Sequence, residues 1–254
     1  MTRRPGFPAR LDLSPAAPAA KAAAKRGPTP PVAPQGLGMD SSAVRARMVR
    51  KLAQEGIADP AVLAAMGTVE RHRFVDTALV NQAYEDTSLP IGLGQTISKP
   101  SVVARMIELL LGGRRDANGR LGRVLEVGTG CGYQAAVLAC VANEVYSVER
   151  LRGLHDKARD NLRPLRLANV HLLFGDGMAG YPKGAPYAGI IAAAGGEAVP
   201  GTWIDQLAEG ARIVAPMALA DGRQSLVVLE KTNGRVKQTV LETVHFVPLK
   251  SGIA

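Results

Sequence analysis

Two patterns of hydrophobic and polar positions divide the chain near residue 112. In the first part, apolar residues recur every three or four positions from Ser41 or Ser42 to Gln54, which predicts a helix. The stretch "DPAVLAAMGTV" predicts a second, short helix, with Asp59 as its N-cap and Pro60 at its first position. A third helix is predicted over "SVVARMIELLL", after the glycine-containing loop "IGLGQTISKP".

From about residue 121 onward, apolar strands alternate with turns and helices. Strands are expected at "RVLEV", "EVYSVE", "VHLLF", "YAGIIAAA" and "ARIVAP", and helices at "YQAAVLACVA", "LRGLHDKARDNLRPL" and "VPGTWIDQLAEG". Such alternation implies right-handed crossovers and a parallel sheet with helices on both faces. The last strands, "SLVVLEK" and "VKQTVLETVHFVPL", are joined by "TNGR" and must be antiparallel. The predicted fold class is α/β: a Rossmann-like, mostly parallel, doubly wound sheet that ends in an antiparallel strand pair, with an N-terminal helical cap.

Composition separates the first 38 residues from the rest. This segment holds eight of the 17 prolines, is rich in alanine and lysine, and has almost no large apolar residues. It cannot bury enough surface to offset the entropy of ordering, so a disordered tail with polyproline character is expected, as a dispensable extension rather than a docking segment.

The distribution of charge argues against nucleic acid as a partner. The formal net charge is +9, but residues 1–38 carry six basic residues and one acidic residue, which is more than half of the excess. The remainder is mildly basic with mixed signs, as on an ordinary solvated surface.

The remaining compositional features favour a soluble cytoplasmic protein. No uncharged apolar run approaches the length of a membrane span, and the N-terminus lacks the apolar centre of a secretory signal. Cys131 and Cys140 are too few for a disulfide framework and lack a second ligand pair for zinc, so free thiols are expected. The four histidines have no metal-ligand spacing, and no metal site is predicted.

A glycine-rich turn, "EVGTGCGY", directly follows the strand "RVLEV". Gly128, Gly130 and Gly132 there allow a sharp turn and close approach to a bound group beyond the carboxyl end of the strand. Glu149 lies 21 residues after Gly128, at the end of the next strand, where a carboxylate can accept both hydroxyls of a ribose. The alternative is a tight turn followed by an ordinary exposed glutamate.

The spacing of this turn favours S-adenosylmethionine over a dinucleotide. The third glycine comes one residue earlier than in G-x-G-x-x-G, and Glu126 would repel a pyrophosphate while suiting a cationic amino-acid end. Asp176, in "GDG" after the third strand, is a candidate for the exocyclic amine of adenine, and a plain Asp-Gly turn is the alternative.

Several motifs together resemble the protein-L-isoaspartate O-methyltransferases, particularly those of the bacterial type. They are "LPIGLGQTISKPSVVARMIELL", "VLEVGTGCGYQAAVLA", "VYSVERL", "FGDGMAGYPKGAPY", "WIDQLAEGARIVAPM" and "VHFVPL". The element "GQTIS" is specific to this family, whereas methyltransferases at large share the glycine-rich turn. The resemblance covers about Asp40 to Ala254. It divides the chain into a tail (1–38) and a methyltransferase domain (39–254), with N-terminal helices and active-site loop at 39–112 and the Rossmann-like core at 121–254.

The resemblance implies a protein-repair activity. Such enzymes transfer the methyl group of S-adenosylmethionine to the α-carboxyl of an L-isoaspartyl residue, leaving S-adenosylhomocysteine, and the ester collapses to a succinimide whose hydrolysis returns some normal aspartate. The partners would be isoaspartyl proteins and peptides, with no nucleic acid and no membrane, and the enzyme is expected to be a monomer.

The resemblance also assigns site residues. Ser98 would present its hydroxyl to the isoaspartyl carboxylate, although Pro100 makes helix capping an alternative and compatible role for it. Gln224 would lie near the substrate, with a solvated loop amide as the alternative. The cofactor pocket would be formed by Gln95, Thr96, Ile97, Glu126, Gly128, Thr129, Gly130, Gly132, Glu149, Asp176 and Gly177.

The chain departs from the family pattern near the fourth strand. Ala188 stands where the family commonly has Asp, Gly195 and Gly196 stand where small residues and prolines are usual, and Ala218 stands where Gly is common. If the missing Asp supports the active-site loop, activity would be reduced. Two rival interpretations are kept: another methyltransferase of this fold that acts on RNA or a small molecule, and an inactive cofactor-binding relative, which the departure at Ala188 favours.

Overall fold

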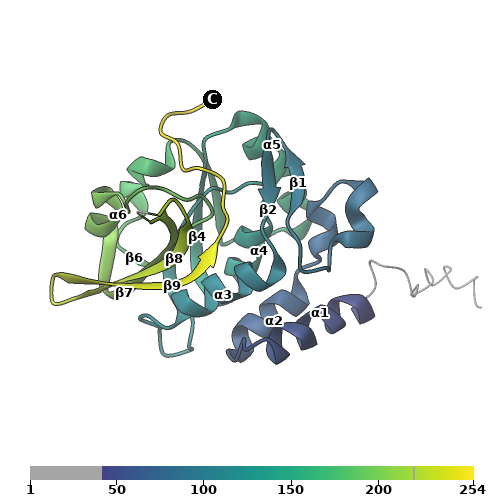
Figure 1. The fold of residues 1–254 in the computed structure, drawn as a ribbon, viewed down its shortest axis with the longest axis horizontal. Coiled ribbons are helices and arrows are strands. Elements are labelled where there is room, and N and C mark those ends of the chain that lie inside the picture. The colour runs from purple at the N-terminus through teal and green to yellow at the C-terminus, as the bar shows by residue number, and fades with distance from the viewer. Residues whose placement is uncertain (1–41, 220) are drawn as a thin grey trace, which may run out of the picture. The chain divides into compact units, whose positions relative to one another are not determined.

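The computed structural model describes residues 42–219 and 221–254 (Figure 1). The predicted tail at 1–38 lies outside the described residues. The first predicted helices are confirmed: α1 spans Ser42–Gln54, α2 spans Pro60–Thr68 and α3 spans Pro100–Leu111. Asp59 caps α2 as expected, because its Oδ1 accepts hydrogen bonds from Ala61 N at 2.8 Å and Val62 N at 3.3 Å.

The α/β architecture is also confirmed. Strands and helices alternate as β3 (Leu121–Val127), α4 (Tyr133–Val141), β4 (Ala142–Glu149), α5 (Arg152–Leu162), β5 (Val170–Phe174), β6 (Tyr187–Ala192), α6 (Gly201–Gln206) and β7 (Leu207–Ala218). Short 3₁₀ segments lie at Arg71–Phe74 (η1), Thr77–Gln82 (η2), Arg163–Leu165 (η3), Gly177–Ala179 (η4) and Pro182–Gly184 (η5).

The seven-stranded sheet has the order β5-β4-β3-β6-β7-β8-β9. Pairing is parallel from β5 to β7, and β8 (Gln224–Thr232) and β9 (Arg235–Val244) are antiparallel to their neighbours. The tight turn at Asn233 and Gly234, both with positive φ, joins β8 to β9 as the sequence predicts. The strand order reverses between β3 and β6, so a crevice is expected outside their carboxyl ends.

The region around α6 and β7 differs from the prediction. A helix was expected over "VPGTWIDQLAEG", but α6 ends at Gln206 and β7 begins at Leu207, four residues before the predicted strand. Leu207 already pairs with Tyr187 at the start of β6, across an irregular register. Pairing with a neighbouring strand, which is not visible in local sequence, therefore ends the helix early.

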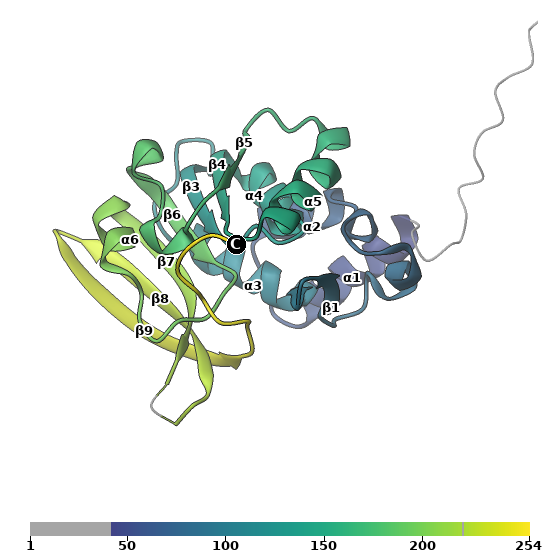
Figure 2. The ribbon, with the colours of Figure 1, turned by 90° about the horizontal axis from the view of Figure 1, so that it is seen from above.

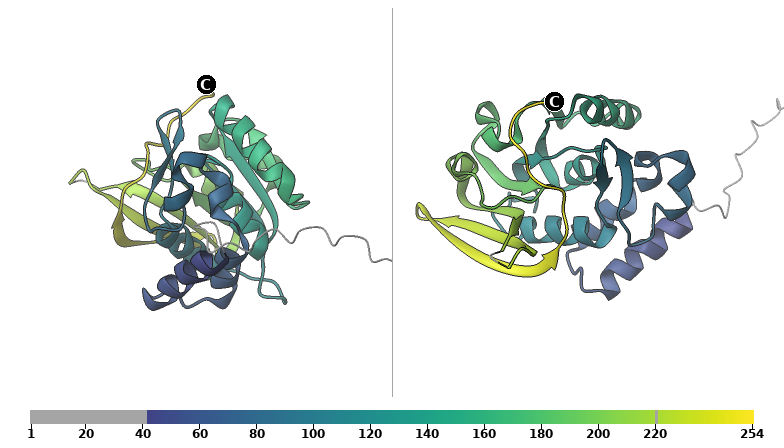
Figure 3. Two further views of the ribbon diagram at one scale, coloured as in Figure 1. Left: turned by 90° about the vertical axis from the view of Figure 1, so that its right-hand side faces the viewer. Right: turned by 45° about the horizontal axis from the view of Figure 1, so that its top comes forward.

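Two hydrophobic cores lie on opposite faces of the sheet. Neighbouring residues along a strand point to opposite faces, so Val124 belongs to one core and Leu125 to the other. The first core is covered by α3 and α4, and α1 and α2 pack against these helices (Figures 1 and 3). The second is covered by α6, through Trp203.

The stretch expected to be only a loop before α3 is a β-hairpin. β1 (Leu89–Gly92) pairs antiparallel with β2 (Gln95–Ile97), separately from the main sheet. The burial of Leu89 and Ile91 alternates with the exposure of Pro90 and Gly92, which is the strand period. That alternation covers only four residues. In a stretch that also contains glycines, which are typical of loops, it was too short to predict a strand.

Candidate functional site

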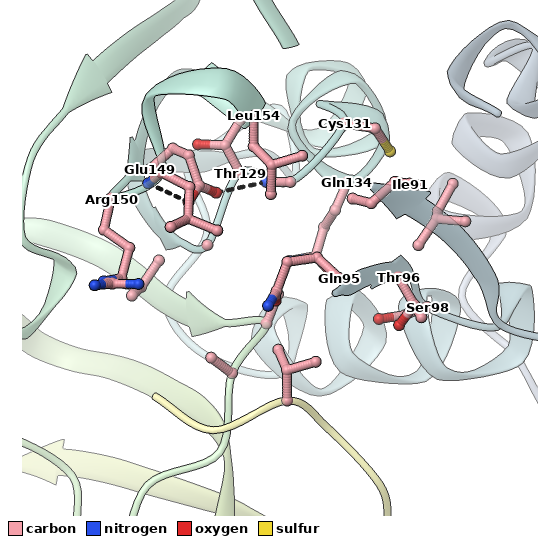
Figure 4. Close-up of a pocket in the computed structure, with 18 of the residues that line it drawn as sticks. Ile91, Gln95, Thr96, Ser98, Thr129, Cys131, Gln134, Glu149, Arg150 and Leu154 are labelled. Atoms are coloured by element: carbon pink, nitrogen blue, oxygen red, sulfur yellow. Dashed lines mark hydrogen bonds between the residues drawn. The ribbon is translucent and has the colours of Figure 1, made fainter. Parts of the chain in front are cut away.

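A cavity of about 490 Å³ lies at the carboxyl ends of β3, β4 and β6, where the strand order reverses. Its other walls come from the β1–β2 hairpin, the start of α4, and residues 247–250 after β9 (Figure 4). A cavity of this size and position suits a small molecule with a nucleoside. Nine of the predicted site residues line it: Gln95, Thr96, Ile97, Ser98, Gly128, Thr129, Gly130, Glu149 and Gly177.

Two glycines of the turn after β3 are required by conformation, and one of them, Gly130, also by space. Gly128 and Gly130 have φ of +91° and +57°, a region that side chains disfavour. A Cβ at Gly130 would lie 3.2 Å from Ile91 Cδ1, so the turn and the hairpin approach each other here. The glycines thus let the backbone form the cavity wall.

Glu149 is only 5% exposed and holds this turn in place. Its Oε2 accepts a hydrogen bond from Gly130 N and its Oε1 one from Leu151 N, each at 2.9 Å (Figure 4). Each carboxylate oxygen can accept more than one hydrogen bond, so both keep capacity toward the cavity. The residue can therefore shape the turn and accept a pair of hydroxyls at once.

Glu126 lies beneath the turn instead of at the cavity wall. It is fully buried and hydrogen-bonds Ser147 Oγ, which in turn lies 2.6 Å from Thr129 Oγ1. Burial raises the pKa of Glu126 to about 8. The expectation that this carboxyl faces a cationic group in the turn does not match this placement; the carboxyl instead supports Thr129 from below.

Replacing Glu126 with glutamine is expected to change how stability depends on pH. The folded-state pKa lies above the unfolded value, so the wild type loses stability as pH rises from about 5 to about 8, where folding opposes ionisation. Glutamine cannot ionise, and the variant should melt at least about 3 °C higher at pH 8 than the wild type, with a smaller difference at pH 5. Thermal denaturation across this range measures it, and parallel curves for the two proteins would contradict it.

Asp176 and Gln224 do not line the cavity but hold the segment after β9. Asp176 Oδ2 accepts from Gly252 N at 2.6 Å, and its Oδ1 accepts from Met178 N at 2.8 Å. Gln224 bonds both backbone groups of Phe246, at 2.7 and 3.2 Å. Gly132, the fourth predicted residue outside the cavity wall, is the N-cap of α4.

The segment after β9 was not predicted to form part of the site. It runs across the carboxyl ends of the strands, pairing at Pro248 with Gly195 and at Ala254 with the backbone of Arg150 and Arg152 (Figure 2). Its residues 247–250 line the cavity. The sequence motif "VHFVPL" marked the segment as part of the family, but its position depends on these long-range contacts.

Gln134 was also missed. It lies in the first turn of α4, lines the cavity and is 8% exposed. Within the described residues its amide nitrogen makes no hydrogen bond of good geometry, although the Gln134 side chain lies close enough to the buried carboxyl of Glu126 to lower the pKa of that group. A buried donor left in this state is costly, so it marks a place where a bound acceptor would fit.

Ser98 follows β2 and faces the cavity, half-buried (Figure 4). Within the described residues its hydroxyl makes no hydrogen bond, and the N-cap of α3 is Lys99, without a side-chain cap bond. Asp86 serves the start of α3 instead, since it accepts from Ser101 N and Ser101 Oγ, both at 2.8 Å. The capping alternative for Ser98 is thus not what the structure shows.

Ala188, the departure from the family pattern, lies at the start of β6. The cavity is lined by Ala193 and Ala194, just beyond the other end of this strand. With a rise of about 3.3 Å per residue, Ala188 lies more than about 15 Å along the strand from that wall. A direct role for this position at the cavity is therefore not supported.

The described residues hold no group of three or more His, Cys, Asp or Glu side chains suited to a metal ion. Both cysteines are free, with Cys131 at the cavity wall. In residues 42–219 and 221–254, no helix has the length and apolar character needed to span a membrane.

Comparison with known proteins agrees with this site. The chain is 56% identical to a protein-L-isoaspartate O-methyltransferase of Methylibium petroleiphilum, over 98% of this chain and 96% of that protein. It is 58% identical to one of Leptothrix cholodnii, over 85% and 77% of the two chains.

Solved structures point the same way. A protein-L-isoaspartate O-methyltransferase matches with a TM-score of 0.73 and 29% identity, over 82% of this chain and 67% of that one. A Plasmodium falciparum structure of that name, in complex with S-adenosyl-L-homocysteine, shares the fold with a TM-score of 0.67 and 24% identity, over 81% and 98%. The family described as protein-L-isoaspartate(D-aspartate) O-methyltransferase (PCMT) matches residues 43–254, and the chain belongs to this family.

Proposed function

We propose that this protein transfers the methyl group of S-adenosylmethionine to the α-carboxyl of L-isoaspartyl residues in damaged proteins, which starts their repair through a succinimide. The observation that carries this proposal is the pairing of two walls in one cavity. Glu149 lies on the wall formed by the sheet. Ser98, which follows the β1–β2 hairpin, lies across the cavity from it, and its hydroxyl makes no hydrogen bond in the described structure (Figure 4).

The residues present fit S-adenosylmethionine. Glu149 would accept the ribose hydroxyls, and the amide nitrogen of Gln134 would donate to the carboxylate of the methionine end. The glycine turn leaves room for close approach, and Gly177 extends the same wall. When bound, the cofactor supplies a methyl group on a sulfonium, and a neutral thioether is released when that methyl group is transferred.

The protein's own contribution to transfer is alignment and exclusion of water. An isoaspartyl carboxylate is ionised at neutral pH and needs no general base, so orientation by the neutral hydroxyl of Ser98 suffices. Burial raises the pKa of Cys131 to about 11, which keeps this thiol protonated at the cavity wall. A protonated thiol does not compete with the substrate for the methyl group.

We also propose that the enzyme acts as a monomer in the cytoplasm, without a nucleic-acid or membrane partner. The charge distribution supports the absence of a nucleic-acid partner, because more than half of the excess positive charge lies in residues 1–38 and the remaining chain carries mixed signs.

Methyl transfer to a matched peptide pair tests the activity. Radiolabelled S-adenosylmethionine is offered with two peptides that differ only in an L-isoaspartyl or an L-aspartyl linkage. We expect base-labile label on the isoaspartyl peptide and at least about 100-fold less on the aspartyl one. In the aspartyl peptide the α-carboxyl is part of the peptide bond, and the free β-carboxyl, on a side chain, takes a different position relative to the main chain and so to Ser98. Equal labelling of both peptides, or none despite cofactor binding, would refute the proposal.

A further inference from the structure

One face of α5 contacts the parts of the site that must be held together. Gly153, Lys157 and Asn161 are spaced four residues apart and so lie in a row along this helix. Asn161 Nδ2 donates to Cys131 O at 2.9 Å, in the glycine-rich turn. The other two residues of the row contact the β1–β2 hairpin, which lies beside α5 (Figure 1).

The contact at Gly153 is apolar and lies at the tip of the hairpin. Leu93 is 62% exposed, has a φ of +53° and lines the cavity. A Cβ at Gly153 would lie 3.1 Å from Leu93 Cδ1, so the leucine rests against the helix at its only side-chain-free position. A larger residue there would displace the end of the Leu93 side chain.

The contact at Lys157 is polar and lies in the hairpin strand itself. Its Nζ donates to Ile91 O at 2.9 Å and to Asp76 Oδ1, between η1 and η2, at 3.1 Å. Ile91 is 1% exposed and packs against Gly130. One ammonium group therefore joins three segments that are far apart in sequence: the cap, the hairpin and α5.

We propose that Lys157 is a positioning residue for the reaction, whose ammonium group fastens the β1–β2 hairpin, and with it Ser98, to the half of the site that binds the cofactor. The bond to Ile91 O carries this role, because it is made to backbone within the hairpin and the lysine side chain is 30% exposed. The ion pair with Asp76, which is 62% exposed, contributes less. The inference rests on the proposed function only for its effect on methyl transfer.

Lys157→Met keeps the aliphatic stem and removes the ammonium group, and Lys157→Arg keeps the charge. In the full chain with bound S-adenosylhomocysteine, we expect Lys157→Met to speed amide hydrogen exchange at residues 89–98 and cofactor dissociation, each about ten-fold. The KM for the isoaspartyl peptide should rise more than kcat falls. Lys157→Arg should recover most of each effect.

Arg159→Met is the matched control, since Arg159 lies on the same helix, is 61% exposed and pairs only with Asp156 in the described structure. It should leave all three measurements at the wild-type level. Unchanged exchange at residues 89–98 in Lys157→Met, or faster exchange spread over the whole chain, would overturn the proposal. Exchange and cofactor dissociation need no methyl acceptor, so they decide the role of Lys157 even if the peptide is not methylated.

Discussion

Glu149→Gln is expected to lower the affinity for S-adenosylhomocysteine by about 100-fold. The wild-type carboxylate accepts hydrogen bonds from Gly130 N and Leu151 N in a site that is 5% exposed. A glutamine amide has one acceptor oxygen, so its nitrogen would face one of these backbone donors and leave it without a partner. The turn would shift, and the second ribose hydroxyl would lose a charged acceptor. Isothermal titration calorimetry measures the loss.

Glu144→Gln serves as the control for Glu149→Gln. Glu144 lies on the same strand, β4, but near its start, where it pairs with His171 at the surface. Its replacement removes one negative charge from the same strand without touching the cavity, and affinity should stay within about two-fold of the wild type. An equal loss in both variants would mean that net charge, not the position of Glu149, controls binding.

The sequence predicts those parts of the site that depend on local pattern. The strand before Gly128 and the glutamate 21 residues later follow from strand and turn periodicity, and the structure places both at the cavity. The antiparallel end of the sheet follows in the same way from the turn at Asn233 and Gly234. Each of these features is set by residues close together in the chain.

Features that depend on distant contacts were not predictable in this way. The direction of Glu126 is set by Ser147, 21 residues later, and the path of the last segment by Asp176 and Gln224. Glu126 and Asp176 were predicted as cofactor contacts and Gln224 as a residue near the substrate, whereas in the structure their side chains bond neighbouring segments. A family motif indicates that a residue has a role in the site. Only the tertiary structure shows whether its side chain contacts the ligand or supports the segments that line the cavity.

Ser98→Ala is expected to lower kcat/KM for an isoaspartyl peptide by about 30-fold while leaving the affinity for S-adenosylhomocysteine unchanged. The hydroxyl bonds no other group in the described structure, and Asp86 already serves the start of α3, so its removal leaves the fold intact. What it removes is the donor that would orient the substrate carboxylate toward the methyl group.

Ser88→Ala removes a hydroxyl from an exposed position next to β1, in the same hairpin region, and should leave kcat/KM at the wild-type level. Steady-state kinetics and calorimetry on both variants separate orientation from binding. If Ser98→Ala lost cofactor affinity in proportion to activity, the hydroxyl would belong to the cofactor wall. If kcat/KM were unchanged, backbone groups of the hairpin would have to orient the carboxylate instead of the Ser98 hydroxyl.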